Sequence, residues 1–229
     1  MRSRFWIVLV VGTGYVGGIQ AQTAADNTSS SSRITLHLSQ PSALAAIIDI
    51  GKESHQPIGI VLATNATTFC TPQQRLDIED ESPLDAVARM VKPLKYSVAM
   101  KQRVLVVEPN TSPQWLTAIL EHQYNFPALT GLTITSLGTR LDGWMKMEVG
   151  HAPGYAASTH HAPNAQRFDF GAMKSASTEE IANRIVSLGP TGLWMLRPNT
   201  PNPGSALDME IRVAPYDDPD ALLSLDCGP

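Results

Sequence analysis

The chain has 229 residues, of which 43% are hydrophobic and 17% charged, and its formal net charge is −4. This apolar content is enough for a buried core, and the charged fraction is too low for a disordered chain. The mildly acidic balance gives no reason to expect a nucleic-acid partner, because nucleic-acid binding needs clustered Lys and Arg. The length allows one large domain or two small ones.

Residues 1–21 have the composition of a secretory signal peptide. Arg2 and Arg4 form the charged end, residues 5–16 form the apolar segment, and a cleavage site ends at Ala21. The apolar run is too short to span a bilayer well, and no cysteine follows the cleavage site to carry a lipid anchor. We therefore expect a periplasmic or secreted protein with no transmembrane segment in the mature chain.

The same N-terminal stretch contains a glycine pattern that invites a different interpretation. Residues 12–17, GTGYVG, match the dinucleotide-binding pattern GxGxxG. That motif requires a following helix and an acidic residue at the end of a second strand. Instead, the glycines lead into residues 22–33, a small, polar stretch that we interpret as a flexible linker. No dinucleotide or other cofactor is therefore predicted.

Order is expected to begin at Ile34, where apolar residues alternate with polar ones through Leu38, the pattern of a half-buried strand. A helix is expected to begin at about Ser39–Ser42 and to end before Pro57, and residues 58–63 form a second apolar strand. The polar segment 64–74 is expected to be a loop. Two cysteines, Cys70 and Cys227, could form one disulfide in an oxidising compartment or remain buried thiols.

Residues 75–109 predict a strand, a helix and two further strands. Leu76 and Ile78 alternate with acidic residues, Ser82 is a suitable N-cap, and Pro93 stops the helix. The predicted core-facing stripe of this helix follows helical spacing and consists of Leu84, Val87, Ala88 and Val91. Residues 34–109 thus have the order β-α-β-β-α-β-β, which predicts a small α+β domain.

This arrangement resembles the secretin and TonB short N-terminal domain. The matching segments carry the apolar pattern of the two helices and their strands: residues 44–48, 58–60, 76–78, 82–87, 94–98 and 104–107. That family is a periplasmic module that precedes outer-membrane secretin channels and the barrels of signalling receptors. The resemblance implies a non-enzymatic envelope protein that binds a protein partner through a sheet edge or a helix face.

Residues 110–229 predict a second, less regular α+β region. Residues 112–124 are expected to be a helix, and residues 132–134 and 145–149 are expected to be strands. Residues 167–198 have the same order of predicted elements as residues 75–109. They contain a strand, a Ser177-x-x-Glu180 capping box, a helix and a closing strand. We treat this stretch as a hypothetical degenerate repeat. Coincidence remains the alternative, because β-α-β units are common.

No catalytic, cofactor or metal residue is predicted. GxSxG, HExxH, CxxC and P-loop patterns are all absent, and adjacent His160 and His161 are a poor zinc template. The alternative function is a secreted envelope enzyme or a carbohydrate- or peptidoglycan-binding protein that uses the C-terminal region. Its groove would be formed by aromatic residues: Trp115, Trp144, Tyr155, Trp194 and Tyr216, of which Trp194 is better explained by core packing.

The main hypothesis is an envelope interaction module. Its predicted partner-binding residues are Arg89 and Lys92 on the second helix, and Lys101, Gln102 and Arg103 in the final hairpin turn. These side chains were selected because they are charged or polar and lie off the predicted apolar stripes. The sequence leaves open the partner, the pathway, the oligomeric state and any small-molecule ligand.

Overall fold

The structure is a computed structural model that describes residues 33–63, 67–72, 75–152, 165–189, 191–200 and 202–223. From Arg33 onward the described residues form one compact unit. The predicted signal peptide at 1–21 lies outside the described residues, as does the predicted linker apart from Arg33. Cys227 also lies outside them, whereas Cys70 is disulfide-bonded.

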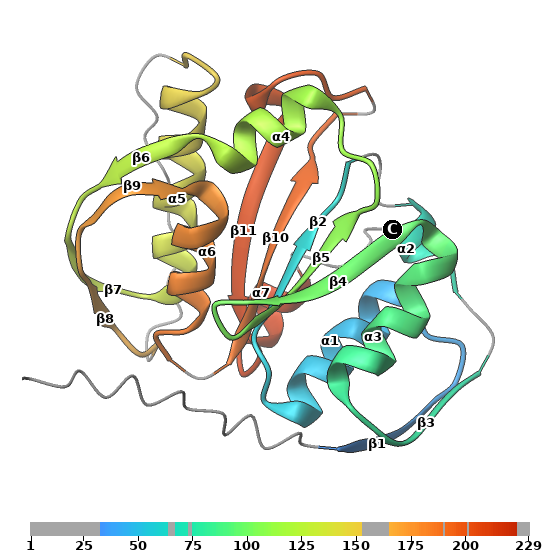
Figure 1. The fold of residues 1–229 in the computed structure, drawn as a ribbon. Coiled ribbons are helices and arrows are strands. Elements are labelled where there is room, and N and C mark those ends of the chain that lie inside the picture. Colours follow the sequence, from blue (N-terminus) through green and yellow to red (C-terminus); the bar gives the residue numbers. More distant parts are fainter. Residues whose placement is uncertain are drawn as a thin grey trace, which may run out of the picture. The chain divides into compact units, whose positions relative to one another are not determined.

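A mixed five-stranded sheet occupies the centre of this unit (Figure 1). Its order is β11-β10-β2-β5-β4, with β2 parallel to both of its neighbours and with two antiparallel hairpins outside it. The strands, in sheet order, are β11 (Met209–Pro215), β10 (Gly192–Pro198), β2 (Ile58–Val61), β5 (Val104–Pro109) and β4 (Tyr96–Lys101). The strands β10 and β11 therefore continue the sheet of the N-terminal segment.

One face of the sheet is covered by elements from the N-terminal half. Helices α1 (Ala43–Ser54) and α3 (Pro83–Val91) pack on this face, outside which lies a ribbon of β1 (Ile34–Leu38) and β3 (Leu76–Glu81). The apolar residues of β2, β5 and β10 that point to this side belong to the same core as the two helices. The short helices α2 (Thr67–Cys70) and η1 (Lys92–Leu94) connect these elements.

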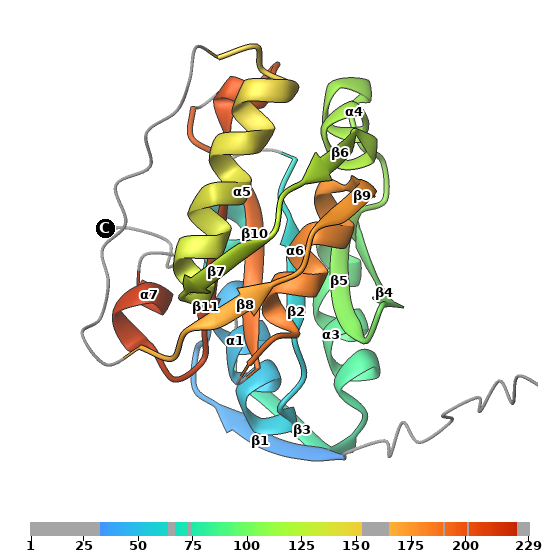
Figure 2. The ribbon, with the colours of Figure 1, turned by 90° about the vertical axis from the view of Figure 1, so that its left-hand side faces the viewer.

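The opposite face is covered by elements from the C-terminal half. Helices α5 (Ile134–Glu148) and α6 (Thr178–Val186) pack on the sheet, with α4 (Gln114–Glu121) beside them. Two further ribbons lie over these helices (Figure 2): β6 (Gln123–Phe126) with β9 (Met173–Ser177), and β7 (Leu129–Leu132) with β8 (Phe168–Phe170). The elements η2 (Ala206–Asp208) and α7 (Pro219–Leu223) flank β11.

Local sequence explains where the main helices begin. The hydroxyl of Ser82 accepts the Asp85 backbone N–H at 3.1 Å, and Ser42 caps α1 in the same way. The capping box predicted at Ser177 and Glu180 is present, with both reciprocal hydrogen bonds formed. Each cap satisfies backbone donors that the first helical turn would otherwise leave without partners.

Several local predictions were wrong. The predicted strand 132–134 contains only the last residue of β7, because Thr133 caps α5 and Ile134 begins it. The predicted helix 112–124 is shorter and ends at Glu121, where β6 follows, and the predicted loop 64–74 contains the short helix α2.

The segment 145–149, predicted as a strand, forms the end of α5, which begins after the N-cap Thr133 and continues to Glu148. The buried residues Leu137, Leu141 and Met145 are spaced four residues apart, as on one face of a helix. This spacing over the whole segment outweighs the alternation of apolar and polar residues at 145–149. In α3, Leu84 was assigned to the core but its side chain is 37% exposed.

The predicted α+β class is confirmed. The hypothesis of a degenerate repeat stays a prediction, although residues 75–109 and 167–198 each contain a capped helix followed by a sheet strand that begins a hairpin. In the two segments these helices lie on opposite faces of the sheet.

The close approach of β2 and β10 makes Gly59 sensitive to substitution. A Cβ atom at Gly59 would lie 2.4 Å from Cε2 of Trp194, a fully buried side chain on the adjacent strand. We expect Gly59→Ala to lower the free energy of unfolding in urea by about 1–3 kcal/mol, because the indole must move within a packed core. Gly171→Ala is the matched control, since a Cβ there meets nothing within 4 Å. If Gly59→Ala and Gly171→Ala were equally stable, the proposed steric conflict between a Cβ at Gly59 and Trp194 would be contradicted.

Candidate functional site: the open edge of strand β4

The two outer strands of the central sheet differ in whether other elements cover their outward backbone groups. At the β11 edge, Asp142 of α5 accepts the backbone N–H of Ile211 at 2.9 Å through Oδ1. Its Oδ2 accepts from Lys146 Nζ at 2.8 Å, and both side chains are largely buried. Burial raises the pKa of Asp142, while Lys146 and the Ile211 N–H act against that rise. A helix and a buried carboxylate thus close this edge to another strand.

The β4 edge has no such cover among the described residues. In the sheet, β4 pairs only with β5, in a continuous register without a bulge. The Asn110 N–H donates to the Lys95 carbonyl at 2.9 Å, which fixes the phase of the antiparallel ladder. By alternation, Ser97, Ala99 and Lys101 direct their backbone groups to β5. The backbone groups of the intervening residues, Tyr96, Val98 and Met100, therefore face the open edge.

An apolar flank of α3 lies next to this edge. The helix α3 packs against β4, and the tight turn η1 reverses the chain between them. The start of α3 is therefore close to the end of β4. Leu84 and Ala88, four residues apart, share one flank of the helix. The Leu84 side chain is 37% exposed, and Met100, which ends the outward-facing series of β4, is 48% exposed.

The charges around the β4 edge are mostly basic. Lys92 and Lys95 lie in the turn that precedes the strand, and Arg103 lies in the turn that follows it. None of these three side chains forms an ion pair within the described part of the chain. The strand edge is thus flanked at each end by a positive charge with no ion-pair partner among the residues that the structure describes.

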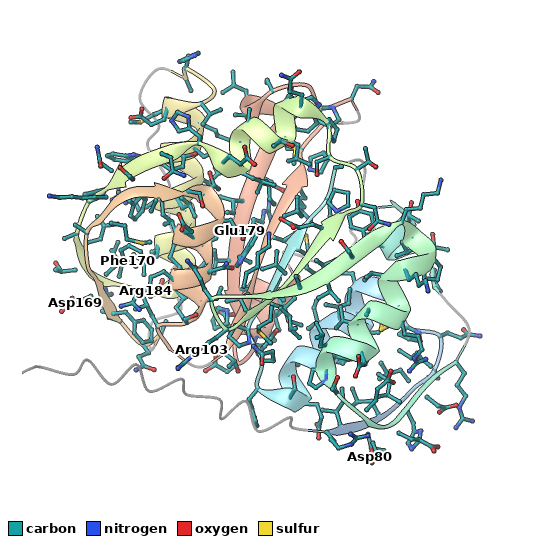
Figure 3. All side chains as sticks on the ribbon, in the orientation of Figure 1. Asp80, Arg103, Asp169, Phe170, Glu179 and Arg184 are labelled. Carbon is teal, nitrogen blue, oxygen red and sulfur yellow. The ribbon has the colours of Figure 1, made fainter. Side chains whose placement is uncertain are left out.

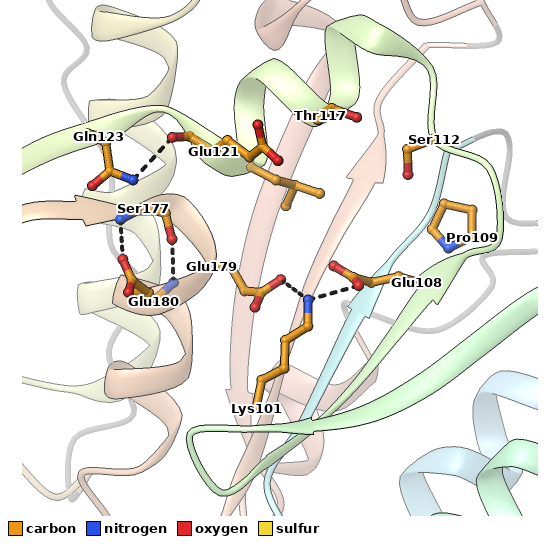
Figure 4. A pocket seen from close by; sticks show the side chains of 11 residues that line it. Lys101, Glu108, Pro109, Ser112, Thr117, Glu121, Gln123, Ser177, Glu179 and Glu180 are labelled. Carbon is orange, nitrogen blue, oxygen red and sulfur yellow. Dashed lines mark hydrogen bonds and ion pairs between the residues drawn. The ribbon is translucent and has the colours of Figure 1, made fainter.

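Lys101, by contrast, is held by two carboxylates (Figure 4). Its ammonium donates to Glu108 of β5 at 2.8 Å and to Glu179 of α6 at 2.9 Å. The three side chains line a polar cavity of about 510 Å³ between the β4–β5 hairpin, α4 and the start of α6. Because it carries one ammonium between two carboxylates, this cluster ties the hairpin to the C-terminal helices.

The pKa of Glu179 is raised to about 7. Burial is the main cause, and the nearby Glu108 carboxyl adds to the shift, while Lys101 acts in the opposite direction. A carboxyl pair with one raised pKa is a feature of some acid–base sites. Here Lys101 occupies the space between the two carboxyls, and no aromatic side chain lines the cavity to support a sugar. We therefore interpret the cluster as a structural tie.

The predicted partner-binding residues fall into separate places. Arg89 binds Glu81 of β3 at 2.8 Å and so faces the outer ribbon. Lys92 lies beyond the far end of β4 from the turn that holds Gln102 and Arg103, and the six-residue strand between them is itself about 17 Å long. Gln102 and Arg103 both adopt positive φ angles in this turn. The structure does not bring the five residues together as one patch.

The aromatic residues of the alternative hypothesis are also dispersed. Trp194 is buried and its indole N–H donates to Asn183 at 2.7 Å, as core packing predicted. Tyr216 donates to the carbonyl of Gln56 at 3.1 Å, and Trp115 packs against the core. Only Trp144 of this set lines a described cavity. Tyr155, His160 and His161 lie outside the described residues.

Sequence patterns missed the residues that define the site. The outward phase of Tyr96, Val98 and Met100 depends on the register with β5, which alternation alone cannot show. No local sequence signal shows that Met100 is exposed. Within the described ranges, no three His, Cys, Asp or Glu side chains are placed to hold a metal, and no helix could cross a bilayer.

No family model matches the chain, and neither a curated protein nor a solved structure matches it. Functional inference therefore depends on the geometry of the site itself.

Removing the carboxylate that closes the β11 edge should be costly. In Asp142→Ala, the Ile211 N–H loses its acceptor and Lys146 loses one of its partners, a buried carboxylate. We expect the free energy of unfolding to fall by about 3–5 kcal/mol in urea titrations. The control Asp217→Ala removes an exposed carboxylate and should change stability by less than about 0.5 kcal/mol. A small effect at Asp142 would show that the edge needs no such closure.

The raised pKa of Glu179 predicts a pH dependence of stability. The folded state holds this proton more tightly than the unfolded state, so the stabilisation is complete below about pH 4.5 and is lost as pH rises through about 7. Glu179→Gln cannot titrate. The stability difference between wild type and Glu179→Gln should therefore shift against wild type by about 1–3 kcal/mol from pH 4.5 to pH 8. Parallel pH profiles in chemical denaturation would refute this.

Proposed function

We propose that this protein is a non-enzymatic interaction module of the cell envelope that binds an extended segment of a protein partner at the open edge of β4. The observation that carries the proposal is the contrast between the two sheet edges. The β11 edge is closed by α5 and Asp142, whereas β4 exposes the backbone groups of three alternate residues. Unpaired strand edges are a common place for a partner strand to add.

Several further features support the same proposal. Beside β4, Leu84 of α3 and Met100 are exposed apolar residues and Ala88 is half-buried, so they could contact side chains from the added strand. The element order of residues 34–109, with α2 inserted, is the one that the resemblance to the secretin and TonB short N-terminal domain implies. The N-terminal residues 1–21 favour export to the envelope.

The charges favour an acidic partner segment over a second copy of this chain. A two-fold pairing of β4 centred on Val98 would place Lys95 opposite Lys101 of the other copy. A pairing centred on Ala99 would place Lys95 opposite Arg103. Like charges directly opposite each other destabilise a strand pair. An extended segment with apolar residues at its centre and carboxylates at its ends would instead match the edge.

Strand addition can be tested with a defined probe, a phage-displayed library of random decapeptides. We expect selected peptides to be acidic and to slow hydrogen exchange at the amides of Tyr96, Val98 and Met100. Met100→Pro removes one outward N–H without breaking the pairing with β5, and should lower peptide affinity at least tenfold. Met100→Val keeps the N–H and is the matched control, with an affinity close to that of wild type.

Charge reversal provides a second arm of this experiment. Lys92→Glu and Lys95→Glu together should weaken acidic peptides, whereas Arg89→Gln should not, because Arg89 faces β3. Binding that is unchanged in Met100→Pro, or protection of amides in other strands, would refute the proposal. Concentration-dependent dimerisation that is lost in Met100→Pro would assign the edge to a second copy instead.

A further inference from the structure

A second cavity lies on the other side of the molecule, between α5 and the corner that joins β6 to β7. Figure 2 shows these two strands running alongside α5. The cavity has a volume of about 260 Å³ and is separate from both β4 and the Lys101 cluster. Its lining comes from the β6–β7 corner (Phe126, Pro127 and Leu129) and from one face of α5 (Thr139, Arg140, Gly143, Trp144 and Met147).

Most of the cavity wall is apolar and well fixed. The rings of Phe126 and Trp144 meet edge to face with centroids 6.0 Å apart, and Phe126 makes a second edge-to-face contact with Phe170 at 5.4 Å. Phe126 and Phe170 are buried, whereas Trp144 is only half-buried. Gly143 contributes no side chain, so a ligand could approach the α5 backbone closely. The wall is thus a preformed apolar surface.

The rim carries a single charged group. The Arg140 side chain is exposed and forms no ion pair or side-chain hydrogen bond with any described residue. Thr139, its neighbour, donates its hydroxyl to the Thr135 carbonyl at 3.0 Å and so offers only acceptor capacity. Arg140 can therefore donate several hydrogen bonds in the planar geometry that a carboxylate accepts.

From this combination we propose that the cavity binds a carboxylate carried on an aromatic or branched aliphatic group. The apolar group fills the space beside Phe126 and Trp144, and the carboxylate pairs with Arg140 at the rim. A volume of about 260 Å³ suits a phenyl or isobutyl group with its carboxylate at the rim. The C-terminal residue of a peptide and a free carboxylic acid share this chemistry.

A neutral sugar fits the same walls less well. Saccharides need several polar partners for their hydroxyl groups, and this cavity offers few beyond Arg140 and Thr139. A purely apolar ligand would leave the guanidinium without a counter-charge beside an apolar surface. The chemistry of the rim thus decides between ligand classes, and it favours an anion.

The test compares small probes by calorimetry and by the indole N–H resonance of Trp144, assigned with Trp144→Phe. The probes are 3-phenylpropionate, N-acetyl-Ala-Phe with a free carboxylate, 3-phenylpropanamide and glucuronate. We expect both apolar carboxylates to bind and to shift the Trp144 resonance, and the amide to bind at least tenfold more weakly. Tighter binding of N-acetyl-Ala-Phe would identify a peptide terminus as the source, and tighter binding of 3-phenylpropionate would identify a free acid.

Three variants distinguish binding in this cavity from effects of charge or stability elsewhere in the protein. Arg140→Gln should reduce the affinity for both carboxylates at least tenfold and leave the amide unchanged, and Trp144→Leu should weaken all three phenyl probes. Arg184→Gln is the matched control, because Arg184 is also an exposed helical arginine, located on α6 (Figure 3), and it forms no ion pair with the part of the chain that the structure describes. Equal affinity for amide and carboxylate, tighter binding of glucuronate, or no binding at 10 mM probe would each overturn the proposal.

Discussion

Burial of the central sheet on both faces is the constraint on which the rest of this structure depends. Along β5 and β10, successive residues alternate between two separate cores, one under α1 and α3 and the other under α5 and α6. At the centre of the sheet, neither face is exposed. A strand that is apolar on both faces cannot be displaced without exposing two cores, so the sheet edges and the outer layers are where binding can evolve.

The two edges then face the same physical problem with different outcomes. An outer strand presents unpaired backbone groups that attract other strands, and proteins usually cover or charge such edges. At β11, α5 brings a buried carboxylate to the Ile211 N–H, which is a specific and energetically demanding closure. At β4 the flanking charges discourage self-pairing but leave the backbone groups accessible. Under the proposed function, this asymmetry would favour selective binding of a partner segment over self-association of the chain.

Local chemistry made much of the first half predictable. Ser42, Ser82 and Ser177 each precede a helix, and each caps it, because the hydroxyl can satisfy the N–H groups of the first turn wherever the helix packs. Alternation located β1, β3 and β4. The helical end at Met145 was missed because five residues carry too little of the period to distinguish the two structures. The exposure of Leu84 is not predictable because helical spacing shows which residues share a face of α3 but not how far the buried part of that face extends.

The site was harder to predict because its defining properties are not local. The sequence groups Lys101 with Gln102 and Arg103 as an exposed turn, but Glu179, 78 residues away in sequence, holds its ammonium in a partly buried cluster. Likewise, the openness of β4 is a property of what the C-terminal half does not cover, and the closure of β11 requires α5 to pack there. By adding β10 and β11 beyond β2, the C-terminal half makes β4 the strand that can still gain a neighbour. A sequence motif cannot encode that choice, because it arises only when both halves share one sheet.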